Sequence, residues 1–112
     1  MRLRSEIWVK SFLRACQTKL INAAVLRHGN DDAGAIYVKI NFLDGTAKLF
    51  IPAPSVSRDQ PSSQTWMAHK QDDIITEREV DDFLHQQVQF DSDLWIIEVE
   101  DKDGRHCLDK WL

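Results

Sequence analysis

Residues 36–51 read Ile-Tyr-Val-Lys-Ile-Asn-Phe-Leu-Asp-Gly-Thr-Ala-Lys-Leu-Phe-Ile. In the first half of this stretch, apolar residues alternate with Tyr37 and Lys39, which is the two-residue period of a strand with one buried face. Asp44 and Gly45 tolerate the positive φ angles of a tight turn, and an extended pattern resumes at Thr46. The stretch therefore predicts two adjacent antiparallel strands.

Two helices are expected, one on each side of this hairpin in the sequence. From Ser5 to about Leu20, apolar residues recur at spacings of three and four, which places them on one helix face. Ser5 is expected to cap this first helix. After the hairpin, Thr76 and Glu79 form a capping box, so a second helix begins there and should end near Phe90.

Runs of β-forming residues bounded by turn residues predict further strands at residues 22–27, 66–69, 94–100 and 105–108. Pro52 and Pro54 end the strand before them, because proline cannot donate to a strand ladder. Together these elements predict an α+β fold. We expect a mainly antiparallel sheet of five or six strands, with two helices packed on one face.

The length of 112 residues suits a single domain with one core, and 55–64 is expected to be a mobile loop because it has low hydrophobicity. The net charge of -4 offers no positive field for a polyanion, so no nucleic-acid partner is expected. Charged residues interrupt the N-terminal stretch, so neither a signal peptide nor a membrane span is expected. Two distant cysteines, Cys16 and Cys107, favour free thiols and a cytoplasmic protein.

Several segments together resemble one known family. They are Ser5 to Val9, Asp31 to Ala35, Leu43 to Ala47 with Pro52 to Pro54, and Phe90 to Trp95 with Asp103 to His106. On these segments the chain resembles a family of short alphaproteobacterial proteins that is catalogued only as a domain of unknown function. The resemblance covers nearly the whole chain and departs from the family mainly between residues 55 and 74. It implies a bacterial cytosolic setting and brings no activity, cofactor or catalytic residue with it.

The loop at residues 28–34 gathers one imidazole, two carboxylates and two glycines. His28, Asp31 and Asp32 are ligand types that a divalent cation accepts. Asn, Asp and Gly are also the residues that turns require, and this second interpretation is favoured, so no metal site is expected.

Arg105 and His106 follow a turn at residues 101–104, which lacks the closing glutamate of a calcium loop. Either residue would complete an acid–base set if the strands brought it to the loop at 28–34. A small enzyme with such a scattered site is the alternative hypothesis, and whether the chain is an enzyme stays open. Because no phosphate loop, nucleophile elbow or zinc motif occurs, no cofactor is expected.

Four tryptophans are a high share for this length. We expect two of them in the core and one of Trp66 and Trp111 to be exposed as a binding residue, since tryptophan brings a large apolar area to an interface. The primary hypothesis is a noncatalytic interaction or small-ligand-binding domain that self-associates as a homodimer. Its motivation is the sheet face that helices on one side would leave uncovered.

Overall fold

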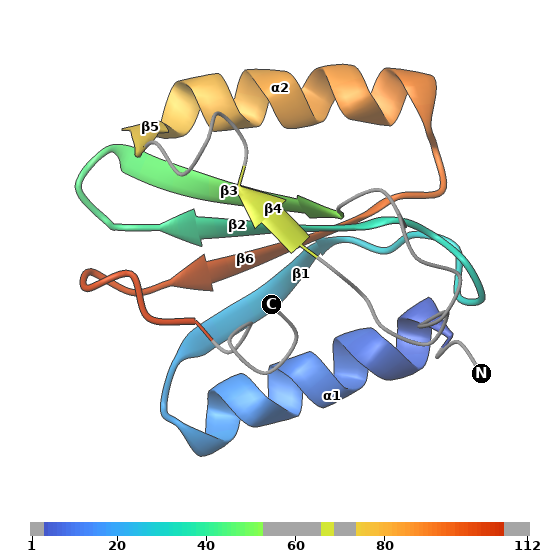
Figure 1. Cartoon of the computed structure of the whole chain (residues 1–112), viewed down its shortest axis with the longest axis horizontal. Coiled ribbons are helices and arrows are strands. Elements are labelled where there is room, and N and C mark those ends of the chain that lie inside the picture. Colours follow the sequence, from blue (N-terminus) through green and yellow to red (C-terminus); the bar gives the residue numbers. More distant parts are fainter. Residues whose placement is uncertain (1–3, 53–65, 69–73, 107–112) are drawn as a thin grey trace.

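The computed structural model describes residues 4–52, 66–68 and 74–106 (Figure 1). Helix α1 spans Ser5–Thr18 and helix α2 spans Glu77–Phe90. The strands are β1 (Asn22–Arg27), β2 (Ile36–Asn41), β3 (Thr46–Pro52), β4 (Trp66–Ala68), β5 (Ile75–Thr76) and β6 (Trp95–Glu100). No helix among the described residues has the length and apolar character that crossing a membrane requires.

The strands form one sheet in the order β1-β6-β2-β3-β4, with β5 paired to β3. The predicted hairpin is confirmed, because β2 and β3 pair antiparallel from Val38 with Phe50 to Asn41 with Ala47. The α+β class and the mainly antiparallel sheet are also confirmed. Among the described strands, the one parallel pair is β2 with β6. Strand β6 lies between β1 and β2, so those two consecutive strands are not neighbours.

The two helices cover opposite faces of the sheet (Figure 1), and the prediction that both pack on one face was wrong. The reason lies in β2, which is buried on both sides. Val38 and Ile40 belong to the cluster under α1, whereas Tyr37 packs in the cluster under α2. Each face therefore needs its own cover.

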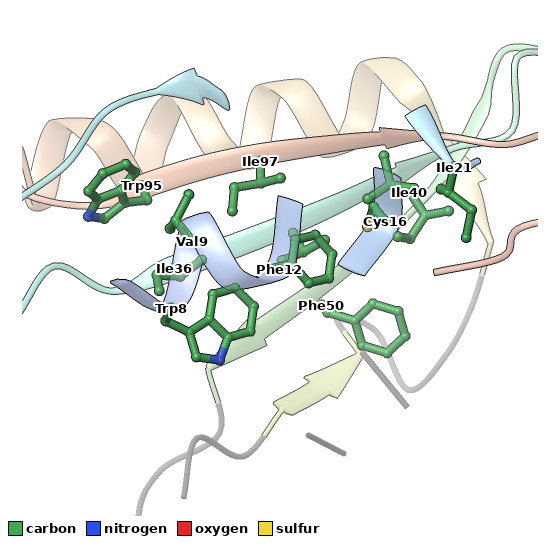
Figure 2. Packing of buried hydrophobic residues seen from close by; sticks show 12 residues of the cluster. Trp8, Val9, Phe12, Cys16, Ile21, Ile36, Ile40, Phe50, Trp95 and Ile97 are labelled. Atoms are coloured by element: carbon green, nitrogen blue, oxygen red, sulfur yellow. The ribbon is translucent and has the colours of Figure 1, made fainter. Parts of the chain in front are cut away.

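The larger core lies between α1 and the sheet, where aromatic and aliphatic side chains from four elements interlock (Figure 2). Phe12 is fully buried and stacks with Trp8, with their ring centroids 5.2 Å apart. Trp8 and Trp95 are 4% and 2% exposed, so the expectation of two core tryptophans is confirmed.

The second helix begins as its capping box predicts, because the Glu79 backbone N–H donates to Thr76 Oγ1 at 3.1 Å. The first helix does not begin as expected. Arg4 holds the N-cap position, and the Ser5 hydroxyl donates instead to the Gly34 carbonyl at 2.7 Å. The Ser5 and Glu6 backbone N–H groups donate to the carbonyl oxygens of Asp32 and Asp31, in the loop at 28–34. The first turn of α1 therefore needs no side-chain cap.

The strand expected at residues 105–108 is absent from its described half, because Arg105 and His106 are not in a strand. Instead, Asp101 holds a turn there, because its carbonyl accepts the Gly104 N–H and its carboxylate accepts the Arg105 N–H. Residues 107 and 108, like the predicted mobile loop at 55–64, lie outside the described residues.

Candidate functional site

The two carboxylates of the loop at residues 28–34 each pair with a different basic side chain. His28 Nε2 lies 2.6 Å from Asp31 Oδ1, and Arg4 Nε donates to Asp32 Oδ1 at 2.7 Å. The side chains of both pairs are largely exposed. Within the part of the chain that the structure describes, no three His, Cys, Asp or Glu side chains are grouped so that they would hold a metal ion.

The same loop is fastened to the segment before β6. The Trp95 indole Nε1 donates to the Asn30 carbonyl at 2.8 Å. The Asn30 backbone N–H donates to the Asp93 carbonyl, also at 2.8 Å. The packing is so close that a Cβ built on Gly29 or Gly34 would lie 2.2 Å from the Asp93 carbonyl oxygen. The loop therefore links α1 to β6, which explains its turn residues without a ligand.

The hydrogen bond from His28 holds the pKa of Asp31 below its ordinary value of about 3.9. Since this pKa is lowered in the folded state, the stability that it contributes is present above about pH 4 and is lost as the pH falls through the folded value. Replacing His28 with alanine should move the Asp31 titration midpoint up towards 3.9, as measured by carboxyl-carbon NMR. His85→Ala, on α2, should leave it unchanged; an unmoved midpoint in the His28 variant would contradict the assignment.

Arg105 and His106 lie on the other end of the sheet. Arg105 donates through Nε and Nη2 to Asp101 Oδ1 at 3.2 and 2.9 Å, and Asp101 Oδ2 accepts the Arg105 and Asp103 backbone N–H groups. The Arg105 hydrogen bonds lower the pKa of Asp101. The His106 ring meets Phe50 edge-on, with 5.0 Å between ring centroids.

The acid–base set of the enzymatic hypothesis is thus divided between two ends of the molecule. The loop at 28–34 precedes β2, whereas Arg105 follows β6, and these two parallel strands run side by side from Ile36 and Trp95 to Asn41 and Glu100. Six-residue strands separate the two ends by roughly 16 Å. The structure does not bring His28, Asp31 and Asp32 together with Arg105 or His106.

The two tryptophans proposed as binding residues stay predictions. Trp66 is the first residue of β4, but its side chain is outside the described part of the chain, as is the whole of Trp111.

Sequence reasoning missed a buried charge cluster on the α2 face. Lys39 is 2% exposed, and its ammonium lies 2.7 Å from Glu77 Oε2, 2.8 Å from Asp81 Oδ1 and 3.0 Å from Glu98 Oε2. Asn41 Nδ2 also donates to Glu77, at 3.0 Å. Burial acts to lower the pKa of Lys39, but the bonds to Asp81, Glu77 and Glu98 outweigh it and raise that pKa above its ordinary value.

A signal for this cluster is present in the sequence but is incomplete. Glu77 and Asp81 are spaced i, i+4, so they share one side of α2, and Lys39 stands opposite Glu98 in the parallel register of β2 and β6. Nothing local indicates that α2 covers this face of β2. The cluster fastens the helix to the sheet, because one ammonium bonds to carboxylates of both α2 and β6.

The outer edge of β1 is the most exposed part of the described sheet. β1 stands at the end of the strand order, and among the described strands only β6 pairs with it. Seven large apolar side chains are exposed in the described part of the chain, and three of them fall within residues 20–26: Leu20 at 88%, Leu26 at 55% and Val25 at 36%.

Residues 3–109 match the model of one protein family, described as "Protein of unknown function (DUF1491)". The chain belongs to the DUF1491 family. The resemblance inferred from the sequence segments is thereby confirmed. No match was found among curated proteins.

Solved structures of DUF1491 relatives come from Caulobacter crescentus and A. tumefaciens, both alphaproteobacteria. The chain is 32% identical to a DUF1491 family protein of known crystal structure from Caulobacter crescentus CB15, with a TM-score of 0.76 over 95% of this chain and 92% of that one. It is also 32% identical to an A. tumefaciens protein solved in solution, with a TM-score of 0.75 over 89% of this chain and 86% of that one. The chain therefore shares its fold with both relatives, and the description of the family assigns it no function.

Proposed function

We propose that this chain is a noncatalytic interaction domain that forms a homodimer through the free edge of β1. The observation that carries the proposal is the exposure of β1, whose outer backbone groups have no partner strand in the described residues. An edge strand of this kind is a template on which another strand pairs. Exposed Leu20, Val25 and Leu26 add apolar area beside it.

The sequence of β1 lacks most of the devices that prevent edge pairing. Asn22 to Val25 contain neither a charge nor a proline, and the single irregularity is the register shift between Val25 and Arg27. The strand also suits pairing with itself. In an antiparallel register centred on Val25, Arg27 would stand opposite the second copy's Ala23, so no like charges meet.

The uncovered sheet face that the sequence predicted is not found in the described sheet, because a helix lies on each face. What stays accessible is the strand edge. We also infer a cytoplasmic setting, since the chain has only two cysteines, far apart in the sequence, whereas small secreted domains usually carry a denser set of disulfides.

Sedimentation velocity at micromolar concentration tests the dimer. The chain should sediment as a dimer, whereas a variant with Ala24→Lys and Leu26→Lys should sediment as a monomer. Both positions are exposed, so the substitutions leave the monomer fold intact. In the dimer they would bring four ammonium groups together across the two-fold axis, which costs several kcal/mol.

The matched control replaces two other exposed apolar residues, Ile74 and Phe90, with lysine. This variant adds the same charge on other surfaces and should remain dimeric. A monomeric parent chain at 100 µM would refute the proposal. Equal dissociation of the control variant would refute the assignment to β1.

A further inference from the structure

A hollow of about 360 Å³ lies between the end of α1 and the turn that follows β6. Its volume is in the range of small-molecule sites. The residues that line it combine basic side chains with one carboxylate, one apolar residue and a glycine: Lys19, Arg105, His106, Asp103, Ile21 and Gly104. Two of the binding residues expected from the sequence, Arg105 and His106, thus meet in one place.

The Arg105 guanidinium is held in a fixed orientation. Asp101, which is only 8% exposed, accepts two of its N–H groups and also two backbone N–H groups of the turn. A guanidinium has five N–H donors, so this anchoring through Nε and Nη2 leaves other donors for a ligand. A buried carboxylate that bonds to an arginine holds the guanidinium in one orientation before a ligand arrives. Less side-chain entropy is then lost when the ligand binds.

We propose that this hollow binds a small organic anion through a carboxylate or phosphate group. Arg105 supplies the planar donor fork that matches such a group, and Lys19 supplies a second positive charge from the C-cap position of α1. Two carboxylates, Asp103 in the lining and Asp101 behind Arg105, balance these two charges, so the attraction for an anion comes from the remaining Arg105 donors and the Lys19 ammonium at short range. The net charge of the chain is -4, which repels a long polyanion. A small anion that contacts only the hollow is screened from most of the other charges, so a small ligand is favoured.

NMR titration of the ¹⁵N-labelled full chain tests the proposal, with inorganic phosphate and succinate as separate probes and sodium chloride at matched ionic strength as the blank. The Gly104 and Arg105 amide signals should shift and saturate with at least one probe. Saturation by phosphate alone assigns a phosphate ligand, and saturation by succinate alone assigns a carboxylate. Shifts that grow linearly with both probes, as in the blank, would overturn the proposal.

Variants assign the site. Arg105→Gln should weaken binding by about tenfold or more, the usual effect of losing a charged hydrogen bond. Because this change also removes the partner of Asp101, Lys19→Gln is the cleaner variant, and it should weaken binding severalfold with the turn intact. Lys102→Gln is the matched control, since Lys102 belongs to the same turn but does not line the hollow. Equal weakening by the Lys19 and Lys102 variants would show a general charge effect and refute the site.

Discussion

Replacing Lys39 with methionine is expected to lower the free energy of unfolding by roughly 3 kcal/mol. Methionine has a similar length, so the main loss is the ammonium among Glu77, Asp81 and Glu98. Removing the cation leaves three carboxylates facing one another without a counter-charge. The cost stays at the low end for a buried ion pair, because Asp81 is 54% exposed and water screens it.

Urea denaturation followed by circular dichroism measures this loss. Lys10→Met is the control, since Lys10 pairs with Glu6 on the surface of α1 and its loss should cost about 0.5 kcal/mol or less. A double variant with Glu98→Gln separates repulsion from packing. If carboxylate repulsion is the cause, this second change should cost less in the Lys39→Met background than in the parent chain. A loss below about 1 kcal/mol for Lys39→Met would show that the cluster does not fasten α2.

Replacing Gly34 with alanine is expected to cost about 2 to 3 kcal/mol, the range of a forced overpacking. The new Cβ would lie 2.2 Å from the Asp93 carbonyl oxygen and 2.9 Å from both the Asn30 nitrogen and the Trp95 ring. Two of these neighbours are backbone atoms, so the loop itself must move. The same loop accepts the first N–H groups of α1, and its displacement should therefore loosen that helix end as well.

Thermal unfolding measures the effect, with an expected fall in Tm of roughly 10 °C for a domain of this size. Gly45→Ala is the matched control. Gly45 has a φ of +90°, but nothing lies within 4 Å of its added Cβ, so that variant suffers dihedral strain alone and should cost about 1 kcal/mol. A Gly34 variant no less stable than the Gly45 variant would contradict the steric account. Hydrogen exchange at the Ser5 and Glu6 amides would report the loosened helix end directly.

The candidate sites illustrate where sequence reasoning stops. The composition of the loop at 28–34 indicated a turn, and the structure supports that interpretation because its polar groups bond within the fold. The sequence marked Arg105 as a candidate binding residue but did not show which residues surround it. Lys19 is far from it in the sequence, and only folding places both around one hollow. The i, i+4 spacing of Glu77 and Asp81 was an incomplete signal for the Lys39 cluster, because the ammonium and the third carboxylate come from β2 and β6.

By itself, the sequence determined the local elements of this protein. The hairpin at 36–51 and the start of α2 at Thr76 follow from signals that act over a few residues: side-chain alternation, turn conformation and a capping hydroxyl. Only the tertiary structure decided that β6 lies between β1 and β2 and that the helices take opposite faces. Alternation shows which residues of a strand share a face, but what covers each face depends on contacts between distant segments, and these form only when the whole chain packs.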